Sequence, residues 1–115
     1  MLFHKPTLQL LEKEYQRNGE KNLSHIVQDD SMRPVFSMGD RVFGISVEKD
    51  IKLAHQRFCI IKLSLERQFI RRVLVNKDNL LLTALDERIP IINLTHQVQI
   101  FKIVWHFLDQ SQLDF

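Results

Sequence analysis

The stretch DDSMRP places Ser31 where a serine hydroxyl can act as a nucleophile. The short apolar segment HIV precedes it, which predicts a strand that ends in a turn and exposes the serine Oγ. A serine hydroxyl attacks a carbonyl only when a neighbouring group takes its proton, and donors must stabilise the oxyanion that forms. A lysine on a different, largely apolar strand can be that neighbour, because burial lowers its pKa toward neutrality.

The residues after Ser31 extend the pattern. Met32, Arg33 and Pro34 follow directly, and after four more residues Gly39-Asp40 opens an apolar strand. This spacing resembles the Ser-Met-x-Pro and Gly-Asp-x-Val signature of LexA-type self-cleaving repressors, the related phage repressors and polymerase accessory proteins, and the signal peptidases. The segment FIRRVL and the later strands are also similar, so the resemblance covers residues 23–107.

The resemblance implies a fold and a set of roles. The fold is mainly β, with strongly bent antiparallel sheets. Ser31 has the nucleophile position, and Asp30 and Met32 belong to the loop around the oxyanion. Met32 and Pro34 line a groove for an extended peptide. Gly39 and Asp40 form a turn, which Asp40 is expected to cap or pin.

The lysine that acts as the general base in this family is missing from the chain. The family's catalytic lysine matches Arg71, which is followed by Arg72. Arginine stays protonated in proteins, so Arg71 cannot accept the serine proton. Lys62 and Lys52 are the nearest lysines by strand or loop position, yet nothing in the sequence aims either of them at Ser31. The sequence therefore predicts that Ser31 is not activated.

Two further departures point the same way. The family has a glycine before the serine, where this chain has Asp29-Asp30, and negative charge there opposes oxyanion formation. The Ala-Gly or Cys-Gly bond at which the family cleaves itself is also absent. Two interpretations of Arg71 are open: it either bonds Ser31, Asp29 or Asp30 and holds the loop closed, or simply alternates with Arg72 along a strand.

Composition limits the other function classes. The chain has 44% hydrophobic and 26% charged residues and a net charge of +2, which predicts a globular cytoplasmic domain without direct DNA binding or a membrane span. Its single cysteine, Cys59, lies in an apolar run and predicts a buried thiol. The five histidines show no ligand spacing, so no metal is expected. The three glycines, Gly19, Gly39 and Gly44, cannot form a phosphate-binding loop, so no nucleotide cofactor is expected.

Along the chain, residues 6–18 show helical spacing of apolar residues after Pro6. Strand patterns follow at 23–28, 41–47, 56–63, 67–75, 79–85 and 97–107. In the last strand a phase change near Phe101-Lys102 predicts a bulge or bend, and its aromatic residues suit either the core or a dimer interface. The predicted organisation is an N-terminal segment, 1–22, and a β domain, 23–115.

These features predict a non-catalytic relative of the LexA and signal-peptidase group. Its expected role is dimerisation or protein binding within a transcriptional or stress-response regulator, with a homodimer or a peptide as partner. The alternative is an active serine-lysine peptidase that cleaves itself or a partner with another lysine as base. The 22 residues before the first predicted strand are too few for the DNA-binding domain of the family's repressors.

Overall fold

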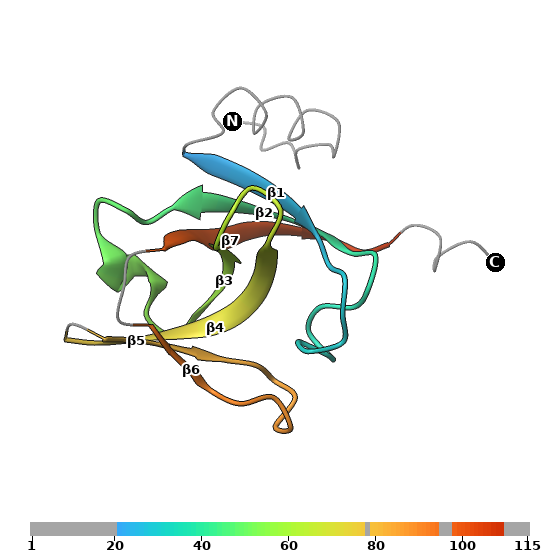
Figure 1. Ribbon diagram of the computed structural model, residues 1–115. Helices are drawn as coiled ribbons and strands as arrows, with labels where there is room; N and C mark the ends of the chain where they lie inside the picture. Colours follow the sequence, from blue (N-terminus) through green and yellow to red (C-terminus); the bar gives the residue numbers. More distant parts are fainter. Residues whose placement is uncertain (1–20, 78, 95–97, 110–115) are drawn as a thin grey trace, which may run out of the picture.

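The structure, a computed structural model, describes residues 21–77, 79–94 and 98–109. They form one antiparallel sheet in the order β1-β2-β7-β3-β4-β5-β6, and β4 is visibly bent (Figure 1). The strands are β1 (Asn22–Ile26), β2 (Arg41–Ser46), β3 (Arg57–Lys62), β4 (Gln68–Asn76), β5 (Asn79–Thr83), β6 (Ile92–Leu94) and β7 (Gln99–Phe107). The predicted mainly β fold is confirmed.

Six of these strands fall where alternating or apolar segments predict them, within a few residues at each end. The exception is β6, which pairs with β5 at the sheet edge and was predicted as loop around Pro90. A three-residue strand is too short to show a period-2 pattern, so its pairing with β5 is what defines it. The predicted helix at 6–18 lies outside the described residues.

A single turn of 3-10 helix, η1 (Ile51–Ala54), joins β2 to β3. Asp50 caps this turn, because its side chain accepts a hydrogen bond from the Lys52 N–H at 3.2 Å. Figure 1 shows η1 and the loop between β1 and β2 at opposite ends of the sheet. The structure therefore separates the Ser31 region from the helical turn.

The apolar side chains form two main clusters. One contains Cys59, Ile61 and Val73 and is covered in part by Ile51 of η1. The other contains Ile60, Phe101 and Met32, so the loop that carries Ser31 packs directly on the sheet. Alternate residues of β3 point to different clusters, as the period of a strand requires.

Strand β7 contains an irregularity beside Gly44. Phe43 pairs with Trp105 whereas Gly44 pairs with Ile103, which leaves Val104 as the extra residue. A Cβ at Gly44 would lie 2.8 Å from the Phe101 Cβ, so only glycine permits this approach of β2 to β7. The irregularity lies at Val104, a little beyond the phase change predicted from the sequence.

Cys59 is fully buried, as predicted, and burial raises the pKa of its thiol to about 12. This thiol is therefore inert as a nucleophile at neutral pH. Within the described ranges, no helix combines the length and apolar character that crossing a membrane requires.

Candidate functional site

The loop from Val27 to Asp40 carries Ser31 and is closed at its base by the backbone. The Val27 N–H donates to the Asp40 C=O at 2.8 Å, and the Gly39 N–H donates to the Val27 C=O at 2.9 Å. Farther along, the Phe36 N–H donates to the Met32 C=O at 3.0 Å. The loop is thus a compact unit that has its own hydrogen bonds.

Asp40 pins this loop to the end of β7. Its carboxylate accepts from the Ser37 N–H at 3.0 Å and from the Asp109 N–H at 2.9 Å, and it lies 2.8 Å from His106 Nε2. Asp40 is only 1% exposed. Burial opposes its ionisation, but these three partners outweigh burial and lower its pKa. The predicted role of Asp40 in the turn matches this geometry.

Gly39 makes the approach of β7 possible. Its φ of 91° lies in the left-handed region that side chains rarely adopt, and a Cβ there would overlap the Asp109 carboxylate. The predicted turn at Gly39 is therefore present. Glycine is required there both by the positive φ and by the close packing of Asp109.

The hydroxyl and the N–H of Ser31 are both bonded to Asp29. The hydroxyl lies 2.5 Å from Asp29 Oδ1, and the Ser31 N–H donates to the same oxygen at 3.0 Å. The Arg71 Nη1 donates to the Ser31 Oγ at 3.0 Å. Because Arg71 can only donate, the hydroxyl proton goes to Asp29. Ser31 is 5% exposed, so this cluster of three residues closes over the hydroxyl.

Arg71 is held in place by β4 itself. Its Nη1 also donates to the Ile70 C=O at 2.7 Å, and its guanidinium carbon lies 4.8 Å from the centre of the Phe69 ring. Burial lowers the pKa of Arg71 and the charge of Asp29 opposes that change. An arginine keeps its proton even when it is partly buried, so Arg71 balances the negative charge of Asp29 and cannot act as a base.

Asp29 is a weak base despite its contact with the hydroxyl. Burial tends to raise its pKa, but the two bonds from Ser31 and the charges of Arg71 and His25 lower the pKa below its ordinary value. A carboxylate with a lowered pKa takes up a serine proton less readily. The Asp29 carboxylate also accepts the hydrogen bond of the Ser31 N–H, so this N–H is not free to stabilise an oxyanion.

The predicted groove residues do not lie around an open groove. The hollow beside Ser31 has a volume of about 30 Å³, which is room for little more than water. Met32 borders it but is 1% exposed and belongs to the core. Pro34 is exposed and does not line the hollow, and Asp30 is an exposed turn residue whose C=O accepts from the Arg33 N–H.

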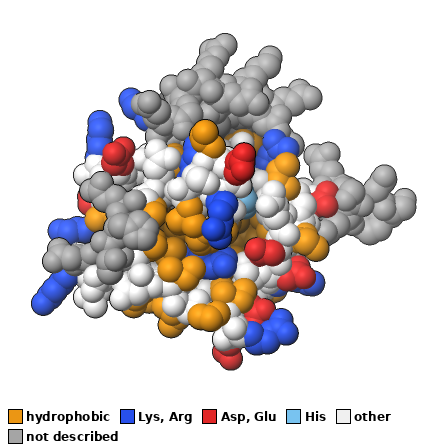
Figure 2. Space-filling model, in the orientation of Figure 1, with side chains coloured by type: hydrophobic (Ala, Val, Ile, Leu, Met, Phe, Trp, Pro, Cys, Tyr) orange, Lys and Arg blue, Asp and Glu red, His pale blue; other side chains and the backbone are white. Residues whose placement is uncertain are grey.

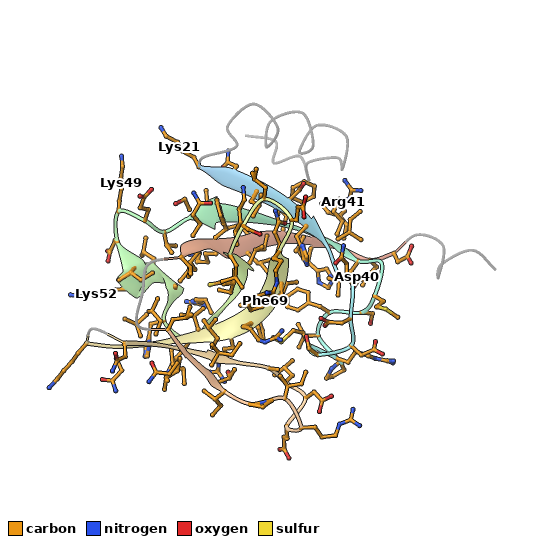
Figure 3. All side chains as sticks on the ribbon, in the orientation of Figure 1. Lys21, Asp40, Arg41, Lys49, Lys52 and Phe69 are labelled. Atoms are coloured by element: carbon orange, nitrogen blue, oxygen red, sulfur yellow. The ribbon has the colours of Figure 1, made fainter. Side chains whose placement is uncertain are left out.

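The lysines considered as substitutes lie elsewhere. Arg71 pairs with Cys59 on β3, whereas Lys62 pairs with Gln68, three positions farther along. Three residues of a strand span about 10 Å, so Lys62 does not replace Arg71 at the hydroxyl. Figure 3 shows Lys52 pointing outward at the η1 side of the molecule, far from Asp40 at the base of the Ser31 loop.

His25 lies beside this cluster and gives it a pH dependence. Burial lowers the pKa of His25, and a hydrogen bond with Gln68 and the charge of Asp29 only partly oppose this. The unfolded chain therefore takes up the proton first as the pH falls below about 6.5, and the free energy of unfolding decreases from there. We expect His25→Gln to flatten that decrease as the pH falls below about 6.5, measured by urea unfolding.

The matched control for this prediction is His55→Gln. The exposed His55 Nδ1 accepts a bond from the Val75 N–H at the opposite end of the sheet. His55→Gln should leave the part of the slope that depends on His25. If the free energy of unfolding falls with pH as steeply in His25→Gln as in the wild type and in His55→Gln, the assignment to His25 is contradicted.

Some contacts of the site have no signal in the sequence. His106 is 66 residues from Asp40 along the chain, and the Asp86 N–H that donates to the Ser31 C=O at 3.0 Å comes from the loop after β5. Both depend on tertiary packing. The role of Asp29 as the acceptor for Ser31 had a partial signal, because an aspartate two residues before a serine often forms such a local bond.

Among the residues that the structure describes, no three His, Cys, Asp or Glu side chains are grouped to hold a metal ion. The site is thus a buried serine hydroxyl bonded between a carboxylate and a guanidinium. The sequence matches no protein-family model, and it matches no curated protein either.

Proposed function

We propose that this chain is a non-catalytic relative of the LexA and signal-peptidase group that works through protein binding or dimerisation in a transcriptional or stress-response regulator. The observation that carries the proposal is the Arg71 guanidinium 3.0 Å from the Ser31 Oγ, at the position that matches the family's lysine. The Ser31 motif and the antiparallel β fold support the relationship. The bonds of Ser31 to Asp29 support the loss of chemistry.

Alkaline incubation tests the loss of chemistry. A serine-lysine peptidase speeds up as its lysine loses a proton, whereas Arg71 stays charged. We therefore expect the wild-type chain to remain intact over days at about pH 10, as followed by mass spectrometry. Any slow fragmentation should occur at the same rate in Ser31→Ala. Fragmentation of the wild type that is absent in Ser31→Ala would instead identify an active serine-lysine peptidase.

The edge of the sheet at β1 is the surface we propose for a partner. The Ser46 N–H bonds the Lys21 C=O at 2.6 Å and the Val27 N–H bonds the Asp40 C=O, so odd-numbered residues of this segment face β2. The backbone groups of Asn22, Ser24 and Ile26 face the other way. Among the described residues, no strand lies on that side.

A second copy of the chain is the partner that this edge fits best. The segment NLSHI has no lysine, glutamate, aspartate or proline to block strand addition. Two antiparallel copies centred on Ser24 pair Asn22 of each copy with Ile26 of the other, which is the self-complementary arrangement of a two-fold dimer. Such a dimer needs no catalytic serine.

Proline substitution tests this edge. Ser24→Pro removes an N–H that points away from β2, so we expect the dissociation constant of the dimer to rise at least about tenfold, measured by sedimentation, while the fold is kept. Leu23→Pro is the control: it removes an N–H that faces β2 and should lower the unfolding temperature. Equal dimerisation of wild type and Ser24→Pro would rule out this surface.

A further inference from the structure

A second hollow among the described residues lies apart from the Ser31 site. Its volume is about 790 Å³, and none of the residues that line it lines the hollow beside Ser31. Its walls come from the end of β2, from η1, from the β3–β4 turn, from the β4–β5 turn and from the start of β7. This volume falls within the range of about 300–1,000 Å³ that small-molecule sites occupy.

The floor of this hollow is apolar. Val47 and Ile100 belong to a buried cluster, and Ile51, Val75 and Leu80 pack against it while still lining the hollow. The hollow therefore opens directly onto the core. Figure 2 shows hydrophobic side chains gathered at the surface in the middle of the face in view, with Lys or Arg side chains among them.

One lysine lies beside each end of β4, which borders the hollow. Lys62 pairs with Gln68, where β4 begins, and Lys77 follows Asn76, where β4 ends. Both line the hollow, and neither forms a hydrogen bond or ion pair with a described side chain. Among the described residues that line the hollow, Glu48 is the one acidic side chain against two lysines, so their net charge is +1. Cations that have no partner among the described residues, placed over an apolar floor, are complementary to an anion with an apolar body.

We propose that this hollow binds a small amphipathic anion, whose apolar body lies on the floor formed by Ile51, Val75 and Leu80 and whose anionic head meets Lys62 or Lys77. The ligand contacts core residues of the folded chain alone, so binding stabilises the folded state. The site is independent of Ser31 and of the β1 edge. It gives the domain a way to sense a small molecule.

Three probes of related chemistry test the proposal. Octanoate carries both an apolar chain and a negative charge, octanol has a similar chain without the charge, and acetate has the charge without the chain. We expect octanoate to shift the NMR methyl signals of Val47, Ile51, Val75, Leu80 and Ile100 and to raise the unfolding temperature. Octanol and acetate should bind at least tenfold more weakly. No shift of these signals with octanoate, or equal binding of octanol, overturns the proposal.

Matched variants separate a specific head site from general charge. The double variant Lys62→Gln with Lys77→Gln should weaken octanoate binding at least fivefold and leave octanol binding unchanged. Lys52→Gln is the control, because Lys52 points outward from η1 and does not line the hollow (Figure 3). An equal loss in Lys52→Gln and in the double variant contradicts a local head site. The outcome is readable whether or not Ser31 is catalytic.

Discussion

Replacement of Asp40 by alanine is expected to lower the free energy of unfolding by about 3–5 kcal/mol, because it removes the shared acceptor of three hydrogen bonds and each donor left unsatisfied costs about 1–3 kcal/mol. Asp40 accepts from two backbone N–H groups and pairs with His106. Alanine leaves these part-buried donors without their acceptor. Urea unfolding at pH 7 measures the change.

Asp40→Asn and Glu87→Ala complete this series. Asparagine keeps the size of Asp40 but offers an NH₂ group to donors, so we expect it to recover less than half of the loss. Glu87 is exposed, and its replacement should change stability by less than about 0.5 kcal/mol. A loss below about 1 kcal/mol in Asp40→Ala would show that this carboxylate does not hold the Ser31 loop to β7.

Conversion of Arg71 to lysine together with Asp29 to glycine is expected to make Ser31 reactive. Burial lowers the pKa at this position, as it does for Arg71, and a lysine that can lose its proton there becomes a base. Removal of Asp29 frees both the hydroxyl and the N–H of Ser31. General-base assistance contributes about 100-fold or more, so labelling of Ser31 by a fluorophosphonate should accelerate by that factor.

Intact mass spectrometry follows this labelling, and the triple variant with Ser31→Ala is the control that should remain unlabelled. Arg71→Lys alone should gain less, because the charge of Asp29 favours the protonated lysine. Equal labelling rates in the wild type and the double variant would mean that Arg71 and Asp29 are not the residues that keep Ser31 unreactive.

The sequence was sufficient for the parts of the fold that depend on local patterns. Segments such as RFCIIK and QFIRRVLV are apolar enough over enough residues to predict β3 and β4, and Gly39-Asp40 predicts a turn before β2. That residue 71 itself cannot act as a base could also be predicted, because an arginine keeps its proton whatever its surroundings.

Contacts that join distant segments could not be predicted in the same way. Nothing in the sequence pairs His106 with Asp40 or brings the Asp86 N–H to Ser31, since both follow from how β7 and the loop after β5 pack. Strand β6 is too short for a pattern of its own. The groove at Met32 and Pro34 stays a prediction; Met32 is buried in the core of this structure, a placement that its local sequence does not indicate.

The distance from the Ser31 Oγ to the nearest side-chain nitrogen, measured in a crystal structure of the wild-type chain, tests whether arginine replaces the catalytic lysine at this serine. We expect the Arg71 Nη1 within about 2.6–3.2 Å and the Asp29 carboxylate on the other side of the hydroxyl. A lysine Nζ in that range, with Arg71 turned away, would contradict this expectation and would restore the reading of a serine-lysine peptidase.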